Sequence, residues 1–176
     1  MKTCFIKLIG IGLLAMWMTP NLAQAEPGEA AAVRSFVQHF YDWYVPLSGH
    51  TKLPPEEEAL KKRTADFSPE LAKALQADLD ANARAGEVVG LDYDPFLNAQ
   101  DPCQKYVVGG KTSEDHGVWK VEVFGVCDGK KEAKASVIAV VKARASHSWF
   151  FTNFEDPEDK TDLLQNLRAL AKERAH

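Results

Sequence analysis

The spacing of apolar residues predicts three helices in the first half of the chain. Apolar side chains recur every three or four positions over residues 29–44, which is typical of an amphipathic helix packed on a core. A short charged helix is expected over residues 56–63. A third helix is expected to begin after Ser68, which can cap it and is followed by proline and glutamate, and to end at Gly86.

From Tyr106 onward the apolar positions change their period from about 3.6 residues to about 2, which is typical of strands. Turn residues separate four stretches of this kind. They cover residues 105–109, 118–126, 131–142 and 148–155. Together they predict an antiparallel meander of four strands.

The residues after the last of these strands predict a C-terminal helix. Asp156 to Asp159 are mostly acidic and include a proline, which favours a helix N-terminus, and leucines recur at helical spacing after them. The order of helices, strands and a final helix predicts the α+β fold class. We expect N-terminal helices packed on a curved four-stranded antiparallel sheet, followed by a C-terminal helix.

The sequence allows two registers for the hairpin between the second and third strands. A two-residue turn at Asp128-Gly129 would pair Cys127 with Lys130. A three-residue loop would instead pair Trp119 with Val137. The second register keeps one face of both strands apolar, so it is the one we favour.

Residues 1–25 have the pattern of a secretory signal peptide. Lys2 and Lys7 precede an apolar run over residues 8–18, and Ala23-Gln24-Ala25 has the small-x-small form that signal peptidase cleaves. The run is too short for a membrane span, which needs roughly 20 apolar residues. We therefore expect cleavage after this motif, and a single domain over residues 26–176 with no membrane span.

Export changes the interpretation of the charge and of the cysteines. The whole sequence has 176 residues, a formal charge of −4 and three cysteines. Cleavage removes Cys4 and two lysines, so the remaining domain is more acidic and keeps Cys103 and Cys127. In an oxidising compartment such a pair predicts a disulfide. The acidic balance and the lack of a basic run longer than residues 61–63 argue against nucleic-acid binding.

The segment over residues 90–103 is the most unusual part of the chain, because it holds Asp92, Asp94 and Asp101 and two Asp-Pro steps. Carboxylates suit calcium, but their spacing does not follow that of an EF-hand. The alternative is a structural loop, in which aspartates accept hydrogen bonds from neighbouring backbone amides while Phe96 enters the core. We favour the structural loop.

Catalysis has weaker support in the sequence. A hydrolase could use Asp92, Asp94 or His116, but paired carboxylates usually face each other across a cleft from separate elements. No two histidines have the spacing of a metal site, and no Gly-x-Ser-x-Gly motif occurs. We therefore expect neither a metal nor a cofactor.

Aromatic residues are concentrated at the end of the first helix and in the last strands. Trp43 lies off the apolar stripe of its helix, and Trp149 and Phe150 point to opposite sides of a strand. Some aromatic surface could therefore be exposed and bind a partner. The alternative, which we favour, is a core that packs most of these rings.

Three blocks, Phe40 to Tyr44, Phe67 to Leu71 and Leu91 to Asp101, carry a family resemblance. Over residues 30–155 the chain resembles small exported bacterial proteins of unknown function that include YbjP-like envelope lipoproteins. The resemblance implies an NTF2-like or cystatin-like α+β cone in the periplasm of a Gram-negative cell. This chain lacks the lipobox of the lipoprotein members, and the resemblance supplies no catalytic residues.

We expect a non-catalytic periplasmic protein that binds another envelope protein or a small ligand. The binding surface is expected to combine the concave face of the sheet with residues 91–100. A specific form of this hypothesis is an immunity-type inhibitor of a cell-envelope effector, suggested by the small size, export, acidity and disulfide. The alternative is a periplasmic hydrolase that uses acidic residues of the 91–101 loop. The expected binding residues are Tyr41, Trp43, Asp92, Tyr93, Asp94, Phe96, Gln100 and Asp101.

Overall fold

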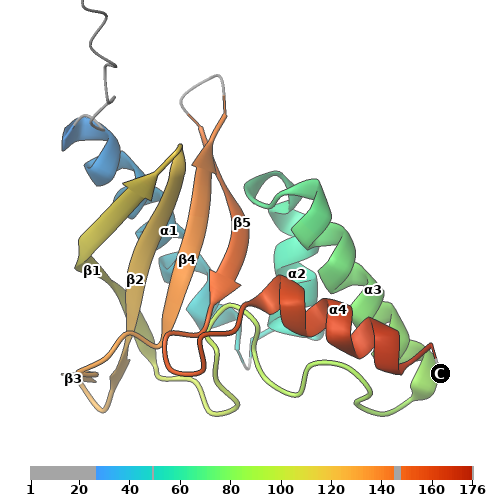
Figure 1. The fold of residues 1–176 in the computed structure, drawn as a ribbon. Helices are drawn as coiled ribbons and strands as arrows, with labels where there is room; N and C mark the ends of the chain where they lie inside the picture. Colours follow the sequence, from blue (N-terminus) through green and yellow to red (C-terminus); the bar gives the residue numbers. More distant parts are fainter. Residues whose placement is uncertain (1–26, 49, 145–147, 176) are drawn as a thin grey trace, which may run out of the picture.

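The computed structural model describes residues 27–48, 50–144 and 148–175, and Figure 1 shows their arrangement. The expected signal peptide, residues 1–25, lies outside the described residues. Within the described ranges, none of the helices has the length and hydrophobicity that crossing a membrane requires.

Helices and strands follow one another in the order that the sequence predicts, and the α+β fold class is confirmed. The helices are α1 (Pro27–Tyr44), α2 (Pro55–Lys62), α3 (Pro69–Ala85) and α4 (Leu163–Glu173), with single 3₁₀ turns at Val45–Leu47 and Thr64–Asp66. The strands are β1 (Lys105–Asp115), β2 (Val118–Cys127), β3 (Lys130–Lys131), β4 (Val137–Ala143) and β5 (Trp149–Glu155).

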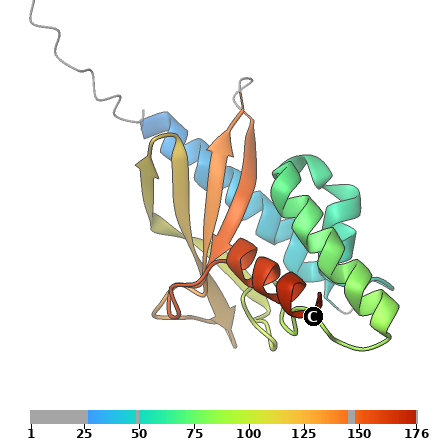
Figure 2. The ribbon, with the colours of Figure 1, turned by 45° about the vertical axis from the view of Figure 1, so that its right-hand side comes forward.

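The strands form one antiparallel sheet in the order β1-β2-β4-β5, which is the predicted meander. The short β3 pairs with β2 and adds a fifth strand at one end of the sheet. Helix α1 lies across one face of the sheet, and α2, α3 and α4 gather beside β5 (Figures 1 and 2). The helices are therefore collected on one face and one side of the sheet.

Aromatic rings fill the space between α1 and the sheet. The Phe40 ring stacks on Tyr44 with a centroid distance of 5.3 Å, and it meets Phe67, Phe96 and Phe151 edge to face at 4.8 to 5.8 Å. All five residues are at most 2% exposed. The favoured alternative of a packed aromatic core is thus correct for these rings, and the face of the sheet that α1 covers is occupied by the protein's own side chains.

Helix α3 begins and ends where the sequence predicts. The Ser68 hydroxyl oxygen accepts a hydrogen bond from the Leu71 N–H at 3.2 Å, and proline follows as the first helical residue. Gly86 ends the helix with φ of 71°, a left-handed conformation that glycine adopts without steric cost. Both ends are set by local interactions, which explains why the sequence pattern finds them.

The favoured register of the β2 hairpin is wrong at its tip. Asp128 and Gly129 both have positive φ, 53° and 75°, and form the two-residue turn that pairs Cys127 with Lys130. This conformation suits a tight turn between twisted strands. The tip therefore follows the other register that the sequence allows.

The apolar face that motivated the other register is nevertheless preserved, because the chain leaves the sheet after β3. Residues 132–136 form a loop before β4, and Trp119 pairs with Val141 instead of Val137. The Ser136 hydroxyl accepts a hydrogen bond from the Gly125 N–H at 2.8 Å, which holds this loop against β2. The excursion shifts the pairing by four residues, so that Val137, Ala139 and Val141 lie opposite the buried β2 residues.

The predicted start of the last helix is also wrong. Helix α4 begins at Leu163, and the Asp162 carboxylate caps it. The Asp156 carboxylate instead accepts hydrogen bonds from the N–H groups of residues 158 and 159, and Lys160 has φ of 55°. These contacts close a turn and place the helix start six residues later than the acidic run suggests.

The free edge of β1 is bonded by a side chain of α1. The Gln38 carboxamide accepts a hydrogen bond from the Val108 N–H at 2.8 Å and donates one to the Tyr106 carbonyl at 3.1 Å. Farther along the same edge, the Arg34 guanidinium donates to the Gly110 carbonyl at 3.2 Å. Helix α1 thus satisfies backbone groups that an edge strand usually leaves to water.

A buried carboxylate ties α3 to the end of α4. Asp78 is 4% exposed, and its carboxylate accepts hydrogen bonds from the Arg174 guanidinium at 2.6 Å and from the Leu91 N–H at 3.0 Å. A Cβ atom at Gly90 would lie 2.4 Å from this carboxylate, so the close approach requires glycine. The pair fixes the segment that leads into the 91–101 loop.

Candidate functional site

Asp94 holds the 91–101 loop in shape. One of its carboxylate oxygens accepts hydrogen bonds from the N–H groups of Phe96 (2.9 Å) and Leu97 (3.1 Å), and the other accepts one from the Tyr44 hydroxyl (2.8 Å). Phe96 and Leu97 are both fully buried. This is the structural loop that the sequence analysis favours over a calcium site.

Burial raises the pKa of Asp94 to about 6, although the hydrogen bonds from Tyr44, Phe96 and Leu97 act to lower it. Glu56 lies near enough for its negative charge to raise the pKa further. The same Asp94 charge contributes to a pKa of Tyr44 well above its usual value, after the larger effect of burial. Asp94 is thus a carboxyl group that the fold holds in an unfavourable environment for its charge.

Replacing Asp94 with asparagine is expected to remove a pH dependence of stability. Well below pH 4 the carboxyl is protonated in both states, but between about pH 4 and 6 the native state keeps a proton that the unfolded state has mostly lost. The free energy of unfolding of the wild type should therefore fall as pH rises, by about 3 kcal/mol relative to Asp94→Asn. Urea unfolding of both proteins from pH 4 to 7 measures this difference.

The exposed Asp92→Asn variant is the matched control for this experiment, because it makes the same chemical change two residues away. It should follow the wild-type curve. Parallel curves for the wild type and Asp94→Asn would contradict the raised pKa of Asp94.

Several expected binding residues lie in the interior. Tyr41 is 1% exposed, and its hydroxyl donates a hydrogen bond to the Phe96 carbonyl at 2.8 Å. Trp43 is partly buried, and the Arg63 guanidinium lies 5.1 Å from its ring centroid. These residues join α1 to the 91–101 loop and to the segment after α2.

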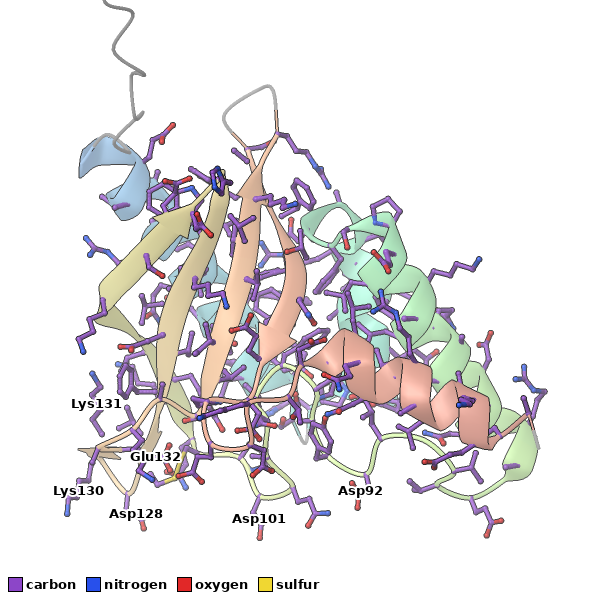
Figure 3. All side chains as sticks on the ribbon, viewed as in Figure 1. Asp92, Asp101, Asp128, Lys130, Lys131 and Glu132 are labelled. Carbon is purple, nitrogen blue, oxygen red and sulfur yellow. A yellow bond between two sulfur atoms is a disulfide. The ribbon has the colours of Figure 1, made fainter. Side chains whose placement is uncertain are left out.

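The remaining expected binding residues lie on the outer side of the loop. The Gln100 side chain donates a hydrogen bond to Asp92 at 3.0 Å, and Asn166 of α4 donates to the Tyr93 hydroxyl at 3.1 Å. Asp101 is exposed, and its carboxylate has no bonded partner in the part of the chain that the structure describes. Figure 3 shows Asp92 and Asp101 at the lower end of the molecule, pointing away from it.

A hollow of about 1060 Å³ lies at this end of the molecule, and we call it the basal depression. Its walls come from three segments, residues 98–106, 127–136 and 156–166, together with Tyr93. These segments precede β1, connect β2 to β4, and connect β5 to α4. Tyr93, Gln100 and Asp101 are the expected binding residues that line it.

The walls of the basal depression carry charges of both signs. Lys130 and Lys131 stand on the β3 side, and Asp156 and Glu158 stand on the side of the turn before α4. The Lys134 ammonium joins the two sides through Glu158 at 2.6 Å, but both side chains are largely exposed, so this ion pair contributes little stability. The depression can therefore contact a partner with polar and charged groups.

The Asp156 carboxylate is held in its charged form at the rim. Burial acts to raise its pKa, but hydrogen bonds from Asn98 and from the N–H groups of Asp159 and Glu158 outweigh burial and leave the pKa below its usual value. Asn98 also donates a hydrogen bond to the Ser136 carbonyl at 3.2 Å. It thereby links all three walls of the depression.

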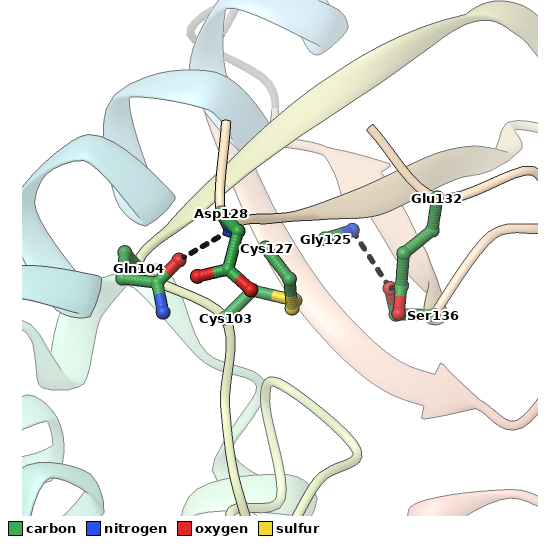
Figure 4. Close-up of a disulfide and its surroundings, with 7 residues drawn as sticks. All are labelled: Cys103, Gln104, Gly125, Cys127, Asp128, Glu132 and Ser136. Atoms are coloured by element: carbon green, nitrogen blue, oxygen red, sulfur yellow. Dashed lines mark hydrogen bonds between the residues drawn. A yellow bond between two sulfur atoms is a disulfide. The ribbon is translucent and has the colours of Figure 1, made fainter. Parts of the chain in front are cut away.

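The predicted disulfide joins Cys103 to Cys127, with a Cα–Cα distance of 4.7 Å, and it forms part of the floor of the depression. Figure 4 shows the bond together with the neighbouring Glu132 and Ser136. The Ser136 hydroxyl donates a hydrogen bond to the Glu132 carboxylate at 2.6 Å. The disulfide therefore fixes two of the three walls relative to each other.

The hydrolase candidates are not brought together. Asp94 is engaged by three donors on the inner side of its loop, whereas His116 is exposed in the turn between β1 and β2, at the far end of these strands. Asp92 is exposed and bonded to Gln100. The geometry gives these side chains no common cleft.

The predicted binding residues do not include those of the depression that follow β2 and β5, among them Lys130, Glu132, Lys134 and Glu158. Their positions depend on loops that leave the sheet, which periodicity does not detect. The predicted Cys103–Cys127 pair is the signal that could have brought residues 127–136 next to the 98–106 segment.

Comparisons with protein-family models, with curated proteins and with solved structures find no match to this chain. The resemblance to exported envelope proteins therefore stays a prediction. The assignment of a function depends on the geometry of the chain itself.

Proposed function

We propose that the chain is a non-catalytic binding protein of the bacterial periplasm, and that its basal depression contacts a polar segment of another envelope protein. The observation that carries this proposal is the hollow of about 1060 Å³ between three loops. Loops held by a rigid scaffold are common binding surfaces. Here the scaffold is the sheet, and the disulfide at Cys103 and Cys127 holds two of the loops.

The chemistry of the walls supports a protein partner over a small apolar ligand. Sites for small ligands are usually lined by hydrophobic and aromatic side chains. The aromatic rings of this chain are instead largely in the core, while lysines, carboxylates and amides line the depression. An immunity-type inhibitor of an envelope effector is the specific form of this function that we propose, because such a protein works by occupying its partner with no reaction of its own.

Site-specific photocrosslinking tests this proposal. A photoreactive phenylalanine analogue replaces Gln100 at the depression, and in the control it replaces His116 in the exposed turn at the far end of β1 and β2. In periplasmic extract, position 100 should give an adduct of one defined mass, and position 116 should not. Unmodified protein in excess should suppress this adduct.

The charge reversals Lys130→Glu and Lys131→Glu should weaken the adduct at position 100, because these residues line the same depression. Equal adducts from positions 100 and 116, or no protein adduct from position 100, would show that the depression does not bind an envelope protein.

A further inference from the structure

Glu132 places a carboxylate beside the two sulfur atoms of the disulfide. One oxygen of Glu132 and the Sγ atoms of Cys103 and Cys127 all lie within 4.8 Å of one another. The residues come from three different places: the segment before β1, the end of β2 and the loop after β3. The disulfide itself offers this carboxylate no donor, and the hydrogen bond that positions the carboxylate comes from the Ser136 hydroxyl.

Gly125 of β2 leaves room between these groups. A Cβ atom at this position would lie 2.7 Å from the Cys103 Sγ and 2.8 Å from a Glu132 carboxylate oxygen. Any other residue would therefore fill the space that the sulfur and the carboxylate share. The Gly125 N–H also bonds the Ser136 hydroxyl, which in turn donates to Glu132 at 2.6 Å. In metal sites, carboxylate ligands are oriented by hydrogen bonds from groups that do not themselves touch the metal. The Ser136 hydroxyl has this relation to Glu132.

The cluster can be reached from solvent, because Cys103, Cys127 and Glu132 all line the basal depression. A metal site needs such an entry path, together with ligands of suitable type and number. Three protein ligands and a water molecule satisfy a tetrahedral cation. The depression supplies the open side on which the water would lie.

We propose that the reduced form of this chain binds a thiophilic divalent cation, Zn²⁺, through Cys103, Cys127 and Glu132. A dithiol reductant supplies two electrons and two protons, which convert the Cys103–Cys127 bond into two thiols while the reductant is oxidised to its own disulfide. Binding of Zn²⁺ then releases both thiol protons to solvent and forms two metal–thiolate bonds. The same sulfur atoms thus bond either each other or the cation.

The ligand set selects the cation. Thiolates are soft ligands that favour zinc over calcium or magnesium, and a carboxylate oxygen is an accepted third ligand of zinc. The lining of the depression holds five carboxylates against three lysines, so its net negative charge adds attraction for a cation. Calcium is therefore expected not to bind at this position.

Titration with Co²⁺ as a spectroscopic probe tests the site. The purified protein is reduced with a dithiol, the reductant is removed without oxygen, and Co²⁺ is added. Reduced wild type should show a thiolate-to-cobalt charge-transfer band and a tetrahedral visible spectrum that saturate at one equivalent, and excess Zn²⁺ should remove both. Oxidised wild type should show neither. If reduction unfolds the protein, Co²⁺ should restore its circular dichroism as the band appears.

Glu132→Gln tests the third ligand, because the glutamine keeps an oxygen for Ser136 but loses the charge. It should weaken Zn²⁺ binding to the reduced protein at least tenfold. Glu122→Gln on β2 is the matched control, and it should bind Zn²⁺ as tightly as the wild type. Reduced wild type that binds Co²⁺ no better than oxidised protein, or equal affinities of Glu132→Gln and wild type, would overturn the site.

The rate of disulfide formation gives a second measurement that does not require a folded reduced protein. Zn²⁺ should slow air oxidation of the two cysteines in the wild type, and should slow it less in Glu132→Gln. Equal oxidation rates with and without Zn²⁺ would contradict the proposal.

Discussion

Asp78→Ala is expected to lower the free energy of unfolding by about 4 kcal/mol. The Arg174 side chain is only 20% exposed, and its guanidinium lies 2.6 Å from the Asp78 carboxylate. The substitution removes this carboxylate and leaves the guanidinium unpaired. Removing one member of a buried ion pair typically costs about 3 to 5 kcal/mol, because the other charge stays desolvated. The Leu91 N–H loses its acceptor as well. Urea unfolding at neutral pH, followed by circular dichroism, measures the loss.

Asp80→Ala is the matched control, since it removes an exposed carboxylate from the same helix. It should change stability by less than about 0.5 kcal/mol. The double variant Asp78→Leu/Arg174→Met should recover much of the loss, because it leaves no unpaired charge. A cost below 1 kcal/mol for Asp78→Ala would show that the pair does not anchor the C-terminal helix.

Replacing both Cys103 and Cys127 with serine is expected to cost about 3.5 kcal/mol. The disulfide spans a sequence separation of 24 residues, and closing a loop of this length restricts the unfolded chain by about that amount. Comparison of the urea midpoints of the oxidised wild type and the double-serine variant measures the effect. Intact mass after alkylation without reductant supplies the control, because the oxidised protein should accept no label at these cysteines.

Loss of the disulfide should also affect the proposed binding surface. Without the bond, the 98–106 segment and the hairpin tip at β3 lose their covalent link at the floor of the basal depression. The double-serine variant should therefore weaken the crosslink from position 100 even where it stays folded. Equal stability of the variant and the oxidised wild type would contradict a stabilising role for the disulfide.

The features predicted correctly from the sequence are those that neighbouring residues determine. Ser68 and Gly86 mark the ends of α3 through contacts within one helical turn. The meander follows from the alternation along each strand. In contrast, the start of α4 depends on how Asp156 closes a turn, and the acidic run alone does not reveal that turn.

The hairpin shows how a correct physical criterion can select a wrong pairing. An apolar shared face was the reason to favour Trp119 opposite Val137, and the structure meets the same requirement with Val141. The difference lies in residues 132–136, which a bond between Ser136 and Gly125 holds outside the sheet. Spacing in sequence cannot anticipate a loop of this kind.

The candidate site was predicted only in part for the same reason. The 91–101 loop was identified from its composition, and its Asp94 and Phe96 act as the favoured structural interpretation expects. The depression needs two further segments that are distant in sequence. Their meeting depends on the disulfide and on Asn98, which bonds the Ser136 carbonyl.

The contact of Gln38 with β1 restricts the ways in which this protein can be recognised. Its carboxamide is hydrogen-bonded to the Tyr106 carbonyl and the Val108 N–H. An incoming peptide would need these two backbone groups in order to extend the sheet. At the opposite edge the Ser68 N–H already bonds the Phe151 carbonyl at 2.8 Å. Strand addition is thereby disfavoured on both sides, which protects the chain from edge-to-edge self-association and leaves side chains as the means of selecting a partner.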